Sequence, residues 1–383
     1  MSIQIDIQGA ILIIDRNSPI PQYFQLQTWL IEQIEQGVFK PKDKIPTEAE
    51  LVQITGLARA TIRQAIQNLV NMGYLQRKKR LGTFVLDHGS GVDRRTLVGI
   101  ILPDIRTGYA PILARGAEDE ASKSGYSLIL CNTDDLFVKA EFHANRLIEH
   151  SVSGVIFVPT AAPDDKNQLI INKLLQQNIP VVLADRTIPG DNLDYVTTDN
   201  FDGAYELTRY LILKGHKRIA ITLSDRFNTE RERLAGYKKA LLDYKVPIDP
   251  DIIKIHQGPY AEKAYAKYAR SLLKPEKEIT AIFAGHDRIA YVVYSVAEEM
   301  NISIPENISL VGYDDLRPAC SHTISLTTMH QPIYEMGQES MRLMIKRMTN
   351  PKIDPQKVVL NSNFVARESV RDIRPDFSSG GLY

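Results

Sequence analysis

The sequence predicts two parts of different fold class: a small helical domain that ends in a β-hairpin, followed by a much larger α/β core. The first part rests on three helical segments and two short β-runs, which all come before residue 87. The second part rests on apolar β-runs that alternate with amphipathic helices along the rest of the chain. A length of 383 residues agrees with two or three domains.

The first domain is expected at residues 18–86, behind an N-terminal arm at 1–17. Alternating isoleucines in the arm leave two alternatives open, a short extra strand or an ordered arm. Within the domain, Thr47 and Glu50 have the spacing of a capping box, which begins a helix. Apolar spacing and helix breakers predict helices at 21–37, 48–54 and 59–72, and β-runs at 75–78 and 83–86.

Helix, turn, helix and hairpin in this order predict a winged helix-turn-helix, whose third helix enters the major groove of DNA. The chain as a whole is neutral, yet no carboxylate occurs between Glu50 and Asp87 to neutralise the cations there. Those cations are Arg59, Arg63, Arg77, Lys78, Lys79 and Arg80. Such a local excess indicates a polyanionic partner, and arginine can pair with guanine in two hydrogen bonds. The alternative is an ordinary helical bundle with a solvated surface hairpin.

Candidate DNA contacts lie at the start of the third helix and at the hairpin tip. They are Arg59, Thr61, Arg63, Gln64, Lys79, Arg80 and Gly82.

A polar, glycine-containing linker is expected at 87–95, and the core follows it. β-Runs are predicted at 97–102, 126–131, 152–158, 180–184, 218–223, 279–284 and 308–311. Helices are predicted at 110–124, 137–149, 166–177, 200–214, 230–244, 260–273 and 286–300. This alternation predicts two doubly wound subdomains of parallel sheet with a cleft between them.

Polar residues follow the predicted strands, at the edge where doubly wound sheets bind ligands. They include Asp104, Asp135, Asp185, Arg186, Asp225, His286, Asp287, Asp314 and Asp315, with Arg233 at the start of a helix. Carboxylates accept hydrogen bonds from hydroxyl groups and arginine donates them, so the set suits a small polyol. For any single residue, a helix cap or a loop salt bridge is the alternative.

The first domain resembles the DNA-binding domain of GntR-type repressors. The resemblance lies in the segments PQYFQL (21–26), GVFKPKDKIPTE (37–48), RATIR (59–63), NLVNMGYL (68–75) and GTFV (82–85). It implies DNA contacts at Arg59, Thr61, Arg63 and Gly82. Two positions depart from the family pattern: Ala58 replaces a small hydroxyl residue, and Ala49 stands where many relatives have arginine.

The core, expected at 96–370 before a tail at 371–383, resembles the periplasmic-binding-protein-like effector domain of LacI-type repressors. Matching segments include VGIILPDI (98–105), IPVVLADR (179–186), RLAGYKKAL (233–241) and ENISLVGYDD (306–315). The resemblance implies that this domain binds an effector and forms a homodimer. The implied effector contacts are Asp185, Arg233, His286, Asp287, Asp314 and Gln331, with Arg186 and Tyr109 as weaker candidates. His286 departs from the usual asparagine.

A GntR-type head on a LacI-type core resembles arabinose repressors. The combination implies a repressor of carbohydrate-utilisation genes that binds a palindromic double-stranded operator and is controlled allosterically by a small sugar.

Other functional classes fit the sequence poorly. No phosphate-binding loop, nucleophile elbow or HExxH motif supports an enzyme, and no cofactor or metal ion is expected. Two isolated cysteines agree with a reducing compartment. The N-terminal residues lack the pattern of a signal peptide and no apolar run is long enough to span a membrane, which argues against an exported sugar receptor. A cytoplasmic protein is expected.

Overall fold

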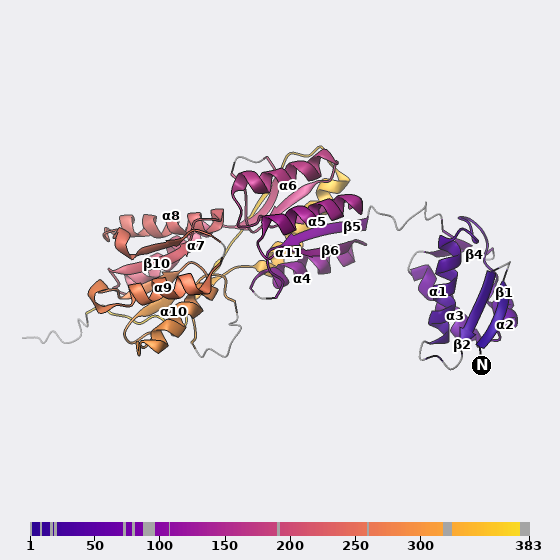
Figure 1. The fold of residues 1–383 in the computed structure, drawn as a ribbon, viewed down its shortest axis with the longest axis horizontal. Helices are drawn as coiled ribbons and strands as arrows, with labels where there is room; N and C mark the ends of the chain where they lie inside the picture. The colour runs from indigo at the N-terminus through magenta and orange to yellow at the C-terminus, as the bar shows by residue number, and fades with distance from the viewer. Residues whose placement is uncertain are drawn as a thin grey trace, which may run out of the picture. The chain divides into compact units, whose positions relative to one another are not determined.

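The computed structural model divides the chain into two compact units, residues 1–94 and 95–383, called here the head and the core. It describes residues 2–7, 10–15, 18, 21–71, 74–78, 81–86, 96–106, 108–189, 192–258, 260–316 and 324–375 (Figure 1). The linker predicted at 87–95 lies outside these residues.

The head is a winged helix-turn-helix, as predicted. Its elements are α1 (Gln22–Glu35), α2 (Glu48–Thr55), α3 (Arg59–Asn71) and the antiparallel strands β3 (Leu75–Lys78) and β4 (Gly82–Val85). One cluster of buried side chains, which includes Leu30, Leu51 and Leu69, joins the three helices. Backbone hydrogen bonds from Ile45 to Thr83 and between residues 42–43 and Val85 tie the loop before α2 to the wing.

Local chemistry fixes both ends of α2. The Thr47 hydroxyl accepts a hydrogen bond from the Glu50 amide at 3.3 Å, and the Glu50 carboxylate accepts one from the Thr47 amide at 2.7 Å. This reciprocal pair satisfies two amide groups that the first turn would otherwise leave free. Gly56 ends the helix with φ 62°, a left-handed conformation that costs glycine little.

The N-terminal arm is an antiparallel hairpin of β1 (Ser2–Ile7) and β2 (Ala10–Asp15), so the strand alternative is correct. The Gln25 side chain on α1 fixes the C-terminal end of β2. Its Oε1 accepts from the Asp15 amide at 2.9 Å, and its Nε2 donates to the Asp15 carbonyl at 3.0 Å. Ile14 is fully buried in the core of the head, and the hairpin therefore belongs to this domain.

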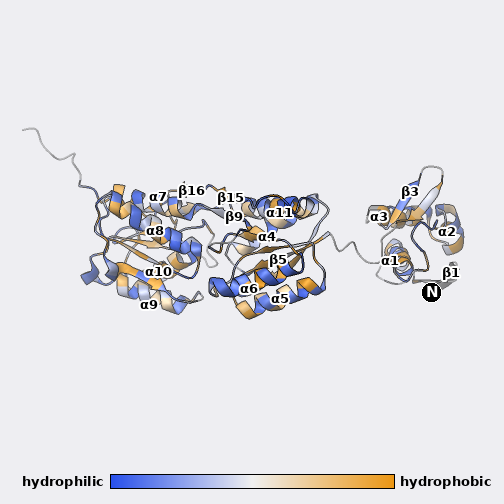
Figure 2. Cartoon of the chain, turned by 90° about the horizontal axis from the view of Figure 1, so that it is seen from above, coloured by the Kyte–Doolittle hydropathy of each residue, from blue (hydrophilic) through white to orange (hydrophobic). Residues whose placement is uncertain are grey.

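The N-terminal subdomain of the core contains a six-stranded parallel sheet in the order β15-β9-β8-β7-β5-β6. Its strands are β5 (Leu97–Leu102), β6 (Ser127–Asn132), β7 (Gly154–Phe157), β8 (Val181–Ala184), β9 (Asp194–Thr198) and β15 (Lys357–Leu360). Helices α4 (Ala110–Lys123) and α11 (Ile333–Thr349) cover one face, and α5 (Phe137–Glu149) and α6 (Asp164–Gln176) cover the other (Figure 2). Buried side chains of these helices pack on the sheet in two apolar clusters.

The C-terminal subdomain repeats this plan with four parallel strands in the order β11-β10-β12-β13. They are β10 (Ile219–Ser224), β11 (Ile253–His256), β12 (Ala281–Ala284) and β13 (Ser309–Val311). Helices α7 (Asn200–Leu213) and α8 (Asn228–Asp243) lie on one face, and α9 (Glu262–Leu272) and α10 (Asp287–Glu299) on the other. A short antiparallel pair, β14 (Thr328–His330) with β16 (Asn363–Val365), completes it.

The prediction of two doubly wound subdomains is confirmed, but several elements were missed. They are β9, β11, β14, α11, β15 and β16. The inward face of α11 mixes methionine with Gly337 and Ser340, which weakens the apolar periodicity that marks a helix. The predicted tail at 371–383 also begins too early, because the His216 ring contacts the Arg371 carbonyl and the Ile373 amide donates to Lys214.

Candidate functional site

The third helix of the head presents its first two turns to solvent. The side chains of Arg59 and Arg63 are 71% and 60% exposed, and their spacing of four residues places them on one face. Gln64 is exposed and Thr61 half-buried in the same stretch. The four candidate contacts predicted on this helix therefore lie on its accessible N-terminal half.

The expectation that no carboxylate neutralises these cations was wrong. Glu48, at the start of α2, lies 4.0 Å from Arg59, 3.4 Å from Arg63 and 3.1 Å from Arg77. The sequence count missed it because Glu48 precedes the basic stretch and approaches it only after folding. Exposed pairs of this kind add little stability, so their main effect is to orient three guanidinium groups.

The wing carries the remaining head candidates. Gly82 has φ 124°, a backbone conformation that residues with a side chain rarely adopt, so this position favours glycine. Lys79 and Arg80 lie outside the described residues.

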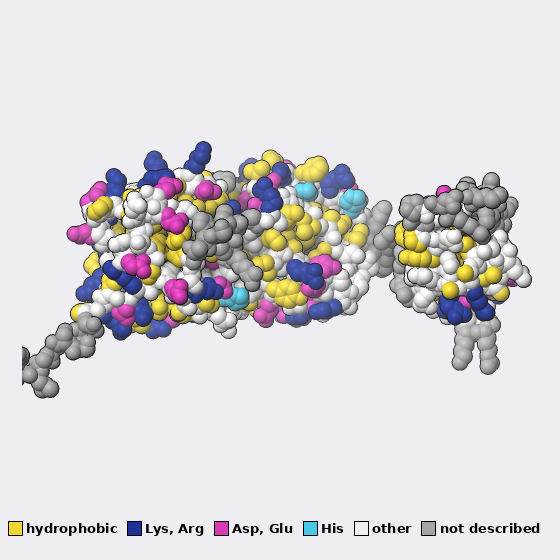
Figure 3. All heavy atoms as spheres, turned by 90° about the horizontal axis from the view of Figure 1, so that it is seen from below, with side chains coloured by type: hydrophobic (Ala, Val, Ile, Leu, Met, Phe, Trp, Pro, Cys, Tyr) yellow, Lys and Arg dark blue, Asp and Glu magenta, His cyan; other side chains and the backbone are white. Residues whose placement is uncertain are grey.

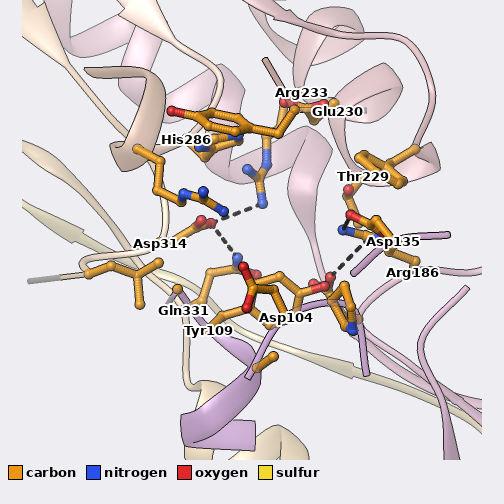
Figure 4. Close-up of a pocket in the computed structure, with 18 residues that line it drawn as sticks. Asp104, Tyr109, Asp135, Arg186, Thr229, Glu230, Arg233, His286, Asp314 and Gln331 are labelled. Atoms are coloured by element: carbon orange, nitrogen blue, oxygen red, sulfur yellow. Dashed lines mark hydrogen bonds and ion pairs between the residues drawn. The ribbon is translucent and has the colours of Figure 1, made fainter. Parts of the chain in front are cut away.

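The core encloses a cavity of about 100 Å³ where the strands of both sheets end (Figure 4). Strand order reverses on either side of β5 and of β10, and a doubly wound sheet binds ligands at such a point. One water needs about 10–15 Å³, so the space holds several waters or one small molecule. Its lining consists of Pro103, Asp104, Gly108, Tyr109, Ala110, Asp135, Asp185, Arg186, Phe227, Thr229, Glu230, Arg233, Tyr260, His286, Arg288, Asp314, Leu316 and Gln331.

Seven of the eight predicted effector residues line this cavity: Tyr109, Asp185, Arg186, Arg233, His286, Asp314 and Gln331. Asp287 does not. Its carboxylate is buried and accepts hydrogen bonds from the Leu316 amide at 2.7 Å and the Thr328 hydroxyl at 2.8 Å. Those contacts match the structural alternative considered for residues after a strand.

Arg233 is the best-anchored cation of the C-terminal subdomain. Its guanidinium donates to Asn200 at 2.8 Å, to the Gly285 carbonyl at 2.7 Å and to Asp314 at 3.3 Å, and it stacks on the Tyr313 ring at 3.7 Å. Only 4% of it is exposed. These contacts together hold the planar guanidinium group in one orientation, as recognition of hydroxyl groups requires.

Arg186 lies in the loop after β8 and lines the cavity from the N-terminal subdomain. It donates to Asp135 at 2.6 and 3.3 Å and to the Pro159 carbonyl at 2.8 Å. Its plane lies 3.6 Å from the centre of the Phe227 ring, which belongs to the other subdomain. The arginine therefore contacts both walls of the cleft.

A chain of hydrogen bonds links the cavity to the segments that connect the two subdomains. Gln331 donates to Asp314 at 2.6 Å and accepts from the Thr198 hydroxyl at 2.5 Å. Thr198 ends β9 and Gln331 precedes α11, so both residues belong to connecting segments. Gln331 therefore joins the cavity lining to the connecting segments.

Burial alters the ionisation of the cavity. Desolvation raises the pKa of Glu230 to about 7 and that of Asp314 to about 6, although Arg233 opposes both shifts. Desolvation and the nearby guanidinium groups of Arg233 and Arg288 hold the pKa of His286 well below its usual value. His286 is therefore neutral at pH 7, and its Nδ1 accepts from the Ile289 amide at the start of α10.

The remaining lining residues escaped the prediction of effector contacts. Asp104 and Asp135 follow predicted strands but are absent from the predicted effector contacts, as are Glu230, Phe227, Tyr260 and Arg288. A signal existed for Glu230, since it lies three residues before Arg233 on the same helix and must share its face. In the part of the chain that is described, no three His, Cys, Asp or Glu residues are placed to hold a metal ion. The helices described there include none long and apolar enough to cross a bilayer.

Comparison with known proteins separates the head from the core. Residues 22–85 match the family of bacterial regulatory proteins called gntR, and residues 208–370 match the periplasmic binding protein-like domain. The HTH-type transcriptional repressor PurR of Proteus mirabilis is 30% identical over 283 residues, which cover 73% of this chain and 82% of that protein.

The chain belongs to the GntR/LacI-type transcriptional regulators.

A relative that spans both parts of this regulator is the arabinose metabolism transcriptional repressor of Geobacillus stearothermophilus. It is 29% identical over 364 residues, 94% of this chain and all of that protein. Among solved structures, a LacI family regulator from Enterococcus faecium with bound ribose has a TM-score of 0.63 at 29% identity, over 73% of this chain and all of that one. CcpA of Lactococcus lactis has a TM-score of 0.66 at 27% identity, over 72% and 100%. The regulator is therefore a transcription factor and not an enzyme.

Proposed function

We propose that this regulator acts in the cytoplasm as a homodimer that represses carbohydrate-utilisation genes from a palindromic operator, and that a small sugar in the core cavity controls its hold on DNA. The observation that carries the proposal is the cavity itself. Fixed guanidinium forks alternate there with carboxylate acceptors at the strand ends of both subdomains. A polyol satisfies donors and acceptors of this kind at once.

Two relatives support the proposal that the effector is a sugar. The Enterococcus faecium regulator has bound ribose, and the Geobacillus repressor is named for arabinose metabolism. The head supports the proposal that the regulator binds operator DNA, because Arg59 and Arg63 extend from the accessible half of α3.

An apolar surface on the N-terminal subdomain supports the homodimer. Leu130 on the edge strand β6 and Leu136, Val138 and Phe142 at the start of α5 are 44–67% exposed. Figure 3 shows apolar side chains gathered on this subdomain. An exposed apolar patch of this type is typical of a protein interface. A twofold axis through it would give the dimer two symmetry-related heads, which match the two half-sites of a palindromic operator.

Two variants separate the functions of head and core. Arg233→Ala should abolish the rise in melting temperature that the effector sugar causes, because it removes the anchored guanidinium group that donates hydrogen bonds. Operator affinity should stay unchanged.

Arg63→Ala should weaken operator binding by about 1–3 kcal/mol and leave the sugar response intact. Thermal-shift screening against pentoses and hexoses and gel-shift titration of the regulator's own promoter measure the two effects. An unchanged thermal response of Arg233→Ala removes that residue from the site.

Phe142→Glu tests the dimer. A charge on the apolar surface should convert the dimer to a monomer in analytical ultracentrifugation and lower the affinity for a palindromic operator. Leu169→Glu, which alters a 56% exposed leucine on α6 of the same subdomain, is the control. A dimer that survives Phe142→Glu contradicts this placement of the interface.

A further inference from the structure

Glu230 carries a buried carboxylate oxygen that has no hydrogen-bond partner among the described residues. The side chain lies in the first turn of α8 and is 3% exposed. Its Oε2 accepts from the Ser224 amide at 3.1 Å, whereas Oε1 accepts nothing there. Leaving a buried acceptor unsatisfied is costly, so such an atom at a cavity wall indicates a ligand donor.

The surroundings of Glu230 keep Oε1 free. Arg233, one turn further along α8, directs its donors to Asn200, the Gly285 carbonyl and Asp314. At Gly285 a side chain would crowd the carboxylate, because a Cβ atom would lie 3.0 Å from Oε1 and 2.5 Å from Cβ of Leu223. Glycine therefore leaves this oxygen uncovered.

A buried hydroxyl group lies on the opposite wall. The Tyr109 side chain lines the same cavity from the N-terminal subdomain, and its hydroxyl interacts with the Asp185 carboxylate. Figure 4 shows Tyr109 and Glu230 on opposite sides of the pocket. A ligand with hydroxyl groups at both ends would contact the two subdomains together.

We infer that Glu230 is a specificity-determining effector contact: its free Oε1 accepts a hydrogen bond from an effector hydroxyl and rejects an effector that places a phosphate or carboxylate there. The inference rests on the proposed function. It selects uncharged sugars over their phosphates, because the two arginines that act on Glu230 are already paired, Arg186 with Asp135 and Arg233 with Asp314. An added anion beside Glu230 would meet a like charge in a medium of low dielectric constant.

Titration calorimetry with D-ribose, L-arabinose, D-glucose and their phosphates tests the inference on the full-length protein. Glu230→Gln keeps the shape and removes the charge, and Glu262→Gln, exposed in the first turn of α9, is the matched control. The neutral sugar that binds the wild type should bind Glu230→Gln at least about 10-fold more weakly and the control equally well. The corresponding phosphate should bind the wild type more weakly than Glu230→Gln.

The pH profile distinguishes recognition by the carboxylate from a merely structural role. Charged or titratable groups that act on Glu230 include Arg233, Arg186, Asp314 and Tyr265. Asp185, His286 and Arg288 line the same cavity. Lowering the pH from 8 to 6 should weaken sugar binding to the wild type more than to Glu230→Gln, because protonation removes the acceptor charge and Asp314 titrates in both proteins. Parallel pH profiles overturn the inference.

Three further results overturn it: equal affinity of Glu230→Gln for the neutral sugar, a sugar phosphate as the best ligand of the wild type, or no binding of any neutral sugar in the panel. Operator binding, measured on the same preparations, keeps the two proposals apart. Wild-type protein that binds its operator and releases it with a sugar phosphate contradicts the role of Glu230 alone. Protein without operator preference contradicts the proposed function.

Discussion

Two carboxyl groups of the cavity, Glu230 and Asp314, titrate near neutral pH because the fold buries them. Asp314 has Arg233 and Gln331 as partners, so its charge is largely compensated. The Glu230 carboxylate has one hydrogen-bond partner among the described residues, the Ser224 backbone amide. Binding sites often keep such costly groups because a ligand, and not the fold, supplies the missing partner.

Glu230→Gln should therefore stabilise the protein without its ligand, and more at pH 8 than at pH 5. The folded-state pKa, about 7, exceeds the value near 4.3 of an unfolded chain, so stability from this group is present at low pH and lost as the pH rises toward 7. Between pH 5 and pH 8 this loss is about 3 kcal/mol. Urea unfolding of both proteins at pH 5 and 8 measures it, and a difference that does not depend on pH contradicts the prediction.

Among the elements, α2 depends most on its cap. It has only eight residues, too few for a helix that is stable by itself. Thr47→Ala removes the hydroxyl that accepts from the Glu50 amide and should destabilise the head by about 1 kcal/mol. Thr47→Ser keeps an acceptor and should cost much less. Calorimetry of the head transition in the full-length protein measures both, and equal effects would show that the hydroxyl is unimportant.

The capping box explains which elements could be predicted from sequence. The ends of α2 depend on Thr47, Glu50 and Gly56, which are all local, and its predicted bounds differ from the observed ones by one residue. Strands β9 and β15 are different, because they are short and pair with each other across more than 150 residues of sequence. Tertiary pairing of this kind leaves no local pattern to read.

The same contrast applies to the site. Most predicted effector residues follow apolar strands, where topology fixes the edge at which they emerge. Glu230 and Arg288 lie within helices, and which face of a helix meets the cavity depends on how the two subdomains pack. Glu48 likewise reaches the basic stretch only through the fold of the head.

At the scale of the whole core, contacts across the cleft hold the two subdomains together. Asn228 on α8 donates to the Thr187 hydroxyl at 2.8 Å and accepts from the Thr187 amide at 2.8 Å. Arg231 lies 3.4 Å from Asp164 at the start of α6. The cleft therefore has a polar latch, formed by Asn228, Thr187, Arg231 and Asp164, beside the effector cavity.

Asn228→Ala should open this latch. Losing two hydrogen bonds, each worth about 1 kcal/mol, favours the open cleft and should lower the affinity for the effector by roughly 10-fold or more. Small-angle X-ray scattering of the core without ligand should show a larger radius of gyration. Thr187→Ser retains the hydroxyl and the amide, so it should behave as wild type. Unchanged scattering and affinity in Asn228→Ala would exclude the latch.

The order of strands in the core also determines when each part of the protein can fold during synthesis. The six-stranded sheet needs β15 at 357–360, and the C-terminal subdomain needs β16 and the Ser369 carbonyl, which accepts a hydrogen bond from the Leu310 amide. The N-terminal subdomain lacks an element until residue 360 and the C-terminal subdomain lacks a contact until residue 369, whereas the head has all of its elements by residue 86. A nascent chain could thus present a finished DNA-reading head well before it possesses an effector sensor. A premature stop between residues 324 and 356 would therefore leave a complete head attached to a core that lacks β15 and β16.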